Sequence, residues 1–176
     1  MPPMSTDADA AVAKLEKVRV ETYRTAPDEF ADTVESVVDG PAVGVELADL
    51  DVSLSDTPVA VDPTPAALKA ATTGVTAASL CVADYGTLVL PDDDRGSELV
   101  SLFVDHHVAI LRESDVVPDM ETAFERFDAD LHGSAAAGES RTSRILATGP
   151  SATADMGELV IGAHGPETVT ALVLEE

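Results

Sequence analysis

The strongest constraint on the fold is a series of short aliphatic runs that alternate with stretches of helical periodicity. Apolar runs of this length, bounded by glycine, proline and aspartate, are typical of buried strands rather than of helices. The runs comprise residues 42–45, 59–61, 75–82, 86–90, 108–111, 144–147, 159–162 and 168–174. Because strands that alternate with helices form parallel sheets, the sequence predicts an α/β layered fold with a largely parallel sheet flanked by helices.

The intervening stretches carry helix start and stop signals. Pro27, Asp28 and Glu29 predict a helix start, since proline fits the first turn and acidic residues stabilise the positive end of the helix dipole. The predicted helices cover residues 10–23, 27–40, 63–71, 98–103 and 118–132, and residues 134–139 form a small, polar, mobile loop. Residues 1–9 are expected to be disordered and residues 10–176 to form a single α/β domain.

The charge of the chain excludes several classes of partner. Lysine and arginine number 10 against 33 acidic residues, which gives a formal net charge of −23. Such a field repels nucleic acid and anionic membrane surfaces. The acidic residues are scattered among apolar ones instead of forming one tail, so they indicate a highly charged folded surface of the kind we expect in a high-salt environment, where salt screens self-repulsion.

Cys81 is the single cysteine, and it lies in an apolar run. We expect it to be a buried small hydrophobe, with a catalytic thiol as the alternative. Because an iron–sulfur cluster needs about four thiolates, this chain alone cannot hold one. The sequence has no signal peptide and no apolar run near the ~20 residues that span a membrane, so we expect a cytoplasmic protein.

Three glycine-marked segments are candidates for chemistry. In residues 74–90, Asp84, Gly86 and Thr87 lie at the junction of two predicted strands, where backbone N–H groups and a hydroxyl would be exposed at a strand end. The alternative is a plain hairpin, with Gly86 present for its positive φ.

The second segment, residues 148–155, follows a predicted strand and predicts the start of a short helix after Gly149. Ser151 or Thr153 would cap that helix, Asp155 would lie in its first turn, and the free N–H groups would favour an anion. The alternative is an ordinary capped helix start without a ligand.

The third segment, residues 162–166, contains His164 before Gly-Pro. A histidine in this position is either a turn residue or a ligand-binding or proton-transfer group. His106 and His107 are adjacent on a predicted strand and must point to opposite faces, so they cannot easily share a metal. A site that joins one of them to His164 and Asp155 is the alternative, and our prediction is no metal site.

Arg141 and Arg144 flank a predicted strand. Their guanidinium groups would clamp a carboxylate ligand or pair with the acidic surface. No G-x-S-x-G pattern marks a nucleophilic serine.

Together these segments resemble the LUD domain family, which includes the lactate-utilization C type of protein. Residues 149–155 and 159–166 are similar to the closing motif of that family, and residues 74–90 are similar to its central motif. His106 to Ile110 resembles the strand that follows. One departure is that Asp84 and Tyr85 stand where the family usually has glutamate and a small hydroxyl residue.

The resemblance implies a sheet like that of the NagB/RpiA/CoA-transferase group. It also implies membership of a system that oxidises L-lactate to pyruvate, in which iron–sulfur clusters belong to partner proteins and this chain carries no cofactor.

From the residues themselves we expect a small anionic ligand between the turn at Asp84 and the start of the predicted helix at Ser151. The expected binding residues are Gly86, Thr87, Gly149, Ser151, Thr153 and Arg141, and the candidate catalytic residues are Asp84, Asp155 and His164. The alternatives are a free-standing acyl-CoA transferase or sugar-phosphate isomerase on the same fold, and a purely structural subunit. The oligomeric state does not follow from the sequence.

Overall fold

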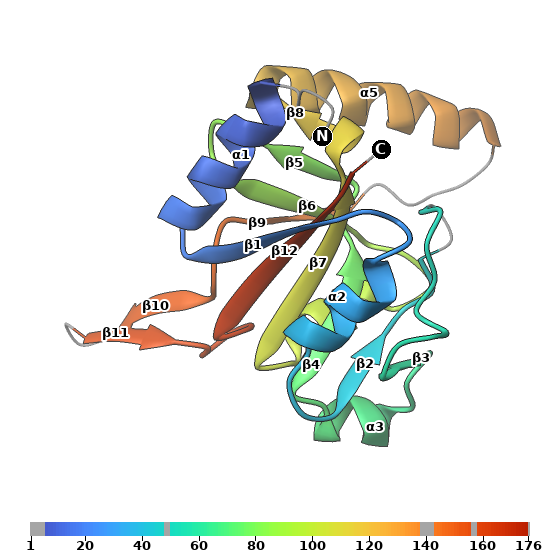
Figure 1. The fold of residues 1–176 in the computed structure, drawn as a ribbon. Coiled ribbons are helices and arrows are strands. Elements are labelled where there is room, and N and C mark those ends of the chain that lie inside the picture. The colour runs from blue at the N-terminus through green and yellow to red at the C-terminus, as the bar shows by residue number, and fades with distance from the viewer. Residues whose placement is uncertain (1–5, 48–49, 138–142, 156–157, 176) are drawn as a thin grey trace.

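The computed structural model describes residues 6–47, 50–137, 143–155 and 158–175. Its centre is a six-stranded sheet with the order β1-β12-β7-β4-β2-β3, in which every pair of neighbouring strands is parallel (Figure 1). The strands are β1 (Val20–Thr25), β2 (Ala42–Gly44), β3 (Val59–Val61), β4 (Thr73–Ala77), β7 (His106–Arg112) and β12 (Thr168–Leu174). The prediction of an α/β fold with a largely parallel sheet is therefore confirmed.

A second sheet of four strands, in the order β8-β5-β6-β9, lies over one face of the first. It contains β5 (Leu80–Val82), β6 (Thr87–Pro91), β8 (Val116–Val117) and β9 (Arg144–Ala147). The predicted strand 75–82 is thus divided between two sheets, because the chain passes from β4 to β5 at Ala78 and Ser79. The alanine N–H still donates to the Ile110 carbonyl of the first sheet, whereas the serine N–H donates to Val89 of the second.

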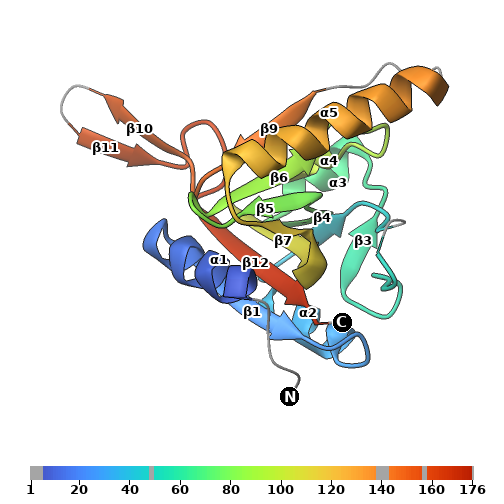
Figure 2. The same ribbon diagram turned by 90° about the horizontal axis from the view of Figure 1, so that it is seen from above.

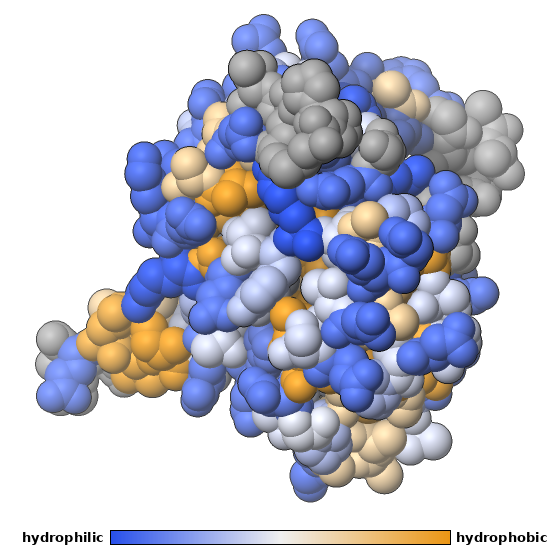
Figure 3. All heavy atoms as spheres, viewed as in Figure 1, coloured by the Kyte–Doolittle hydropathy of each residue, from blue (hydrophilic) through white to orange (hydrophobic). Residues whose placement is uncertain are grey.

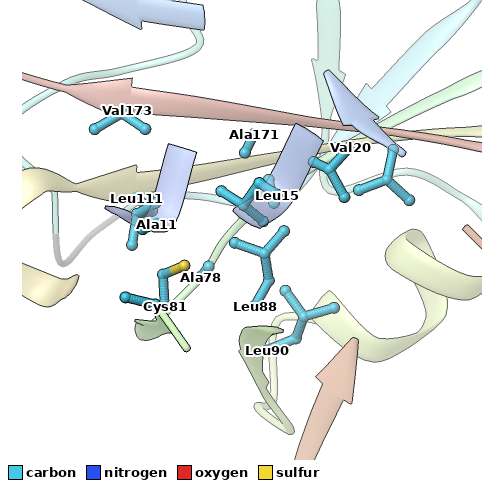
Figure 4. Close-up of a cluster of buried hydrophobic side chains, with 13 residues drawn as sticks. Ala11, Leu15, Val20, Ala78, Cys81, Leu88, Leu90, Leu111, Ala171 and Val173 are labelled. Carbon is cyan, nitrogen blue, oxygen red and sulfur yellow. The ribbon is translucent and has the colours of Figure 1, made fainter. Parts of the chain in front are cut away.

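The main core lies between the two sheets and includes one face of helix α1 (Thr6–Lys17). Figure 4 shows Leu15 from this helix beside Cys81 and Leu88 from the second sheet and Leu111 from the first. Cys81 is fully buried, and burial raises the pKa of its thiol to about 12. The prediction that this cysteine is a buried small hydrophobe is confirmed.

The remaining helices cover the other surfaces of the sheets. Helix α2 (Phe30–Val37) packs Phe30 and Val34 against the opposite face of the six-stranded sheet. Helices α3 (Pro65–Ala70) and α4 (Ser97–Leu102) pack against β2, and α5 (Met120–Ala137) covers the outer face of the second sheet. A short 3₁₀ turn (Glu113–Asp115) leads into β8.

Strands β10 (Ala152–Asp155) and β11 (Glu158–Ile161) form an antiparallel ribbon that projects from the body of the molecule (Figures 1 and 2). Leu159 and Val160 on this ribbon are 59% and 42% exposed. Figure 3 shows the resulting hydrophobic patch beside a largely hydrophilic surface.

Three sequence predictions about the elements were wrong. The helix expected over residues 10–23 begins at Thr6 and ends at Lys17, so residues 6–9 are helical rather than disordered, while residues 1–5 lie outside the described part. The chain turns at Arg19, which has a φ of 66°, and the β-branched and aromatic residues that follow pair with β12.

The second error concerns the end of α5, which runs past Gly133 to Ala137 because the alanines that follow the glycine favour helix. Residues 134–137 of the expected loop are therefore helical, and residues 138–139 lie outside the described part.

The third error is the helix expected after Gly149, where the chain forms the strand β10 instead. The Ser151 N–H donates to the Pro166 carbonyl, and the Ser151 carbonyl accepts from the Gly162 N–H. The backbone N–H and carbonyl of Ser151 are thus hydrogen-bonded to other backbone groups, whereas the N–H groups at the start of a helix would be free.

Candidate functional site

The three glycine-marked segments of the sequence meet in one region of the structure. Thr87 begins β6 and Thr148 follows β9, and their Oγ1 atoms lie 2.7 Å apart because these strands are antiparallel neighbours. Ser151 in turn contacts the third segment, since a Cβ on Gly165 would lie 3.3 Å from the Ser151 Cβ. Successive contacts therefore link the central motif to both parts of the closing motif.

The carboxyl-terminal end of α1 fills the space between the first two segments. A Cβ on Gly86 would lie 3.0 Å from the Lys14 carbonyl, and a Cβ on Gly149 would collide with the Val18 carbonyl oxygen. Both glycines also have positive φ, 62° for Gly86 and 78° for Gly149. These glycines thus allow close backbone approach to the end of α1, which leaves no room for a ligand at those two points.

The predicted binding residues differ in their burial and in their hydrogen-bond partners. The Thr87 side chain is 2% exposed, so its hydroxyl is committed to Thr148. Thr153 is half-buried on β10 opposite Val160. Arg141 lies outside the described residues, whereas Arg144 donates to Asp130 Oδ2 at 2.9 Å and stacks over the Phe127 ring.

The candidate catalytic residues lie at the edges of the region. Asp84 is exposed in the turn before Gly86, and its N–H donates to the Pro118 carbonyl. His164 is exposed in the loop between Gly162 and Gly165. Asp155 pairs with Glu158 at the end of the ribbon, and the structure does not describe its side chain. No described contact brings these three residues together.

A cavity of about 340 Å³ opens beside this region. Its walls come from the residues next to the three contacts just described: Arg19 after α1, Pro150 after Gly149, and Glu167 after Pro166. The amino-terminal half of β12, from Thr168 to Thr170, forms another wall. A volume of this size is within the range of about 300–1,000 Å³ that is usual for small-molecule sites.

His106 contributes the most deeply placed ionisable group of the cavity. It is 9% exposed, and its Nε2 lies 2.8 Å from the Thr170 Oγ1. Burial lowers the pKa of His106, while the negative charges of Asp39 and Glu21 oppose that shift. The imidazole is therefore neutral near pH 7, with one nitrogen held by Thr170.

His107 points to the other face of the sheet, as predicted for adjacent strand residues. Its Nε2 lies 2.9 Å from the Thr76 Oγ1, and burial, followed by the neighbouring His106, lowers its pKa to about 3. The two imidazoles therefore cannot bind the same metal. Among residues 6–47, 50–137, 143–155 and 158–175, no group of three or more histidine, cysteine or acidic residues has metal-site geometry.

Sequence reasoning missed most of the residues around the cavity. Arg19 and Glu21 were assigned to the last turns of the helix expected over residues 10–23, so their position at the edge of a sheet was not predicted. Asp39 follows α2 and joins them only through the folded structure, where the Thr73 hydroxyl donates to its carbonyl and accepts from its N–H. A signal did exist after Arg19, because Val20, Thr22 and Thr25 are β-branched and such residues are more typical of a strand than of a helix.

The sequence model of one family, described as the LUD domain, matches residues 57–174. The chain belongs to the LUD domain family. Its match includes the central motif, the closing motif and the strand that begins at His106, so the resemblance noted from the sequence is confirmed.

Relatives of this LUD domain chain agree with that assignment. A lactate utilization protein C from Halalkalibacterium halodurans is 36% identical over 108 residues, which cover 60% of this chain and 45% of the relative. The uncharacterized protein YkgG from Escherichia coli is 33% identical over 108 residues, again 60% and 45%. The matched part is thus less than half the length of either relative.

A solved structure of a DUF162 family protein from Deinococcus radiodurans has the same fold. It superposes with a TM-score of 0.65 at 18% identity and covers 98% of this chain and 99% of the other. Within the described residues of the LUD domain chain, no helix has both the length and the apolar character needed to cross a membrane.

Proposed function

We propose that this LUD domain chain takes part in the oxidation of L-lactate to pyruvate, beside iron–sulfur partner proteins, and itself binds a small anionic ligand. The observation that carries the proposal is the family match together with relatives that are named lactate utilization protein C at 30–36% identity. Homologues of that name support a lactate-utilization role at the level of the family.

The assignment of the iron–sulfur clusters to partner proteins comes from the family resemblance, and the cysteine content of this chain supports it. A cluster needs about four cysteine thiolates. The chain has one cysteine, and Cys81 lies in the core with a thiol that stays protonated at neutral pH. We therefore propose that the redox centres of the system belong to other chains and that this chain has a non-redox role.

The cavity beside the three motifs is the proposed ligand site. Two features support it: its walls adjoin the central and closing motifs, and it is open to solvent. Arg19 supplies a positive charge there, beside the carboxylates of Glu21, Asp39 and Glu167. His164, Asp84 and Asp155 remain candidate proton-transfer groups at the border of this region. Thr87 and Gly149 take a structural role in the proposal because they pack against Thr148 and α1.

Affinity purification of the tagged chain from a native high-salt extract tests the partnership. Iron and acid-labile sulfide are measured in the eluate, and the tag alone serves as the control. Recovery of cysteine-rich, iron-bearing proteins is the expected result. Recovery of the chain alone and free of iron would reject the partnership and favour a free-standing acyl-CoA transferase or sugar-phosphate isomerase.

A growth experiment tests the pathway separately. Deletion of the gene is expected to abolish growth on L-lactate while growth on pyruvate continues, because the proposed step lies between them. Normal growth of the deletion strain on L-lactate would show that the chain is not required for this oxidation.

A further inference from the structure

We infer that two copies of this chain associate through β1, with the two β1 strands antiparallel across a twofold axis and Thr22 opposite Thr22. The six-stranded sheets of the two copies would then be continuous across the interface. This pairing goes beyond the proposed function, because it requires neither the small anionic ligand nor the iron–sulfur partner proteins.

Strand β1 is the longer of the two edge strands of the six-stranded sheet. It has six residues, whereas β3 at the opposite edge has three. Strand β12 pairs with one side of β1, and in the part of the chain that the structure describes no strand pairs with the other side. Figure 2 shows β1 at the outer border of the sheet, with β12 on its inner side. An open edge of this length is a ready site for pairing with another strand.

A groove of about 540 Å³ follows this open edge. Its walls are Glu16, Arg19 and four successive residues of β1, from Val20 to Tyr23. Because successive side chains of a strand point to opposite faces, four in a row can line one groove only where the groove runs along the edge. The outer side of β1 is thus accessible to a second strand.

The hydrogen bonds of β1 show which of its backbone groups point outward. The Thr25 carbonyl accepts from the Glu175 N–H, just after β12. Since the N–H and C=O groups of successive residues point to alternate sides of a strand, those of Tyr23 also point to β12, whereas those of Thr22 point to the open edge. Two copies of Thr22 that lie opposite each other can therefore exchange both backbone hydrogen bonds, as in an ordinary antiparallel ladder.

The side chain of Thr22 favours the same register. Among the described residues, its Oγ1 is the one buried side-chain oxygen or nitrogen without a hydrogen-bond partner. A buried hydroxyl without a partner is destabilising. Directly opposite residues of an antiparallel pair point to the same face, so the hydroxyl of the second Thr22 would lie beside the first. Threonine pairs of this kind stabilise sheets.

Glu21 and Tyr23 are complementary in this register, because Glu21 of each copy lies opposite Tyr23 of the other. Both side chains are exposed, Tyr23 to 43%. The phenol O–H can donate to the carboxylate, which only accepts, and twofold symmetry provides this pair twice. A register centred on Tyr23 would instead place Glu21 opposite Thr25, whose hydroxyl already contacts the Thr33 hydroxyl at 2.9 Å.

Cysteine cross-linking of the full chain tests the register. Molar potassium chloride is used, because the formal net charge of −23 on each copy opposes association in dilute buffer. Glu21→Cys and Tyr23→Cys chains are oxidised separately and as an equimolar mixture. The parent chain is the control, since its Cys81 is buried.

We expect disulfide-linked dimers from the mixture and few from either chain alone. In the mixture the two cysteines would be directly opposite, with Cα atoms about 4.5 Å apart, which suits a disulfide. Two copies of the same cysteine would be about 7–8 Å apart, which is too far. Cross-linking of either chain alone as fast as the mixture, or none in the mixture, would overturn the pairing.

Charge substitutions test the association without cysteines. Tyr23→Glu places a carboxylate opposite Glu21 twice, so we expect the dimer dissociation constant from sedimentation equilibrium to rise at least about tenfold. Addition of Glu21→Lys to this variant should restore association. Phe103→Glu, which replaces an aromatic side chain that is 69% exposed, is the matched control and should associate like the parent chain. A parent chain that stays monomeric at millimolar concentration, or unchanged association of Tyr23→Glu, would reject the interface.

Discussion

The Oγ1 atoms of Thr87 and Thr148 lie 2.7 Å apart although 61 residues separate them in the sequence. This hydrogen bond joins the central motif of the LUD domain to the segment that leads into the closing motif. The Thr87 side chain is almost fully buried, whereas Thr148 reaches solvent, so the two ends of the bond face different surroundings.

We expect this asymmetry to appear in a double-mutant cycle. Thr148→Val leaves a buried hydroxyl without a partner and should lower the free energy of unfolding by about 1–3 kcal/mol. Thr87→Val should lower the free energy of unfolding by less, because water can replace the Thr87 hydroxyl as the partner of the exposed Thr148 hydroxyl. Denaturant unfolding of both single variants and the double variant gives the coupling, and costs that simply add would contradict the bond.

Replacement of Gly149 by alanine should be among the more damaging small substitutions. The new Cβ would collide with the Val18 carbonyl oxygen, and φ is 78°. We therefore expect the free energy of unfolding to fall by about 3 kcal/mol. Gly96→Ala is the matched control, since Gly96 has a φ of 84° but nothing within 4 Å of the added Cβ, and it should cost only about 1 kcal/mol. Equal losses in denaturant unfolding would mean that contact with α1 is unimportant.

His107 should make the fold sensitive to acid. Its pKa falls from 6.5 to about 3 on folding, so the unfolded chain takes up a proton below pH 6.5 that the folded chain refuses until about pH 3. Stability from this group is thus complete above pH 6.5 and is lost on acidification, by up to about 1.4 kcal/mol per pH unit. His106, whose pKa is also lowered, acts in the same direction.

Unfolding free energies of His107→Gln, measured from pH 7 to pH 4, should show a shallower slope than those of the parent chain, because glutamine does not titrate. If His107→Gln keeps the parent slope, the buried imidazole is not the source of the acid sensitivity.

The thiol of Cys81 should be inert in the folded protein. Burial removes it from reagents and raises its pKa to about 12, so little thiolate exists at neutral pH. A chromogenic disulfide reagent is expected to react only after denaturation, at the rate of unfolding. Rapid stoichiometric reaction of the native chain would show that the core opens at this point.

Salt should stabilise this protein strongly. With a formal net charge of −23, self-repulsion opposes the compact state in dilute buffer, and molar salt shortens the screening length to about 3 Å. We expect the midpoint temperature of thermal unfolding to rise between 0.1 and 2 M potassium chloride. This rise should be well above the rise that sucrose causes at equal osmolarity. A midpoint independent of salt would reject adaptation to a high-salt environment.

Much of the parallel sheet could be predicted because its strands are aliphatic on both faces. The central strands β7 and β12 are examples, since both are covered on two sides and have apolar residues in succession. Strand β1 was missed because Glu21, Tyr23 and Arg24 alternate with β-branched residues along the edge of the sheet. An edge strand keeps polar side chains, so its pattern resembles the surface of a helix.

The candidate site was predicted only in part. The sequence identified the three segments, and the structure brings them together. It did not indicate that Gly86 and Gly149 face α1, because a glycine in a turn has the same pattern whether it approaches a ligand or another backbone. Nor did it indicate the cavity, because Arg19, Asp39 and His106 are distant in sequence and meet only through strand pairing.

The position of β12 has a consequence for how the chain is made. The last strand lies between β1 and β7, so β1 has no described neighbour in the sheet until β12 has been synthesised. A nascent chain therefore cannot pair its first strand before the segment that forms β12 has been synthesised. The first and the last described strands thus become part of the sheet together, although 142 residues of chain lie between them.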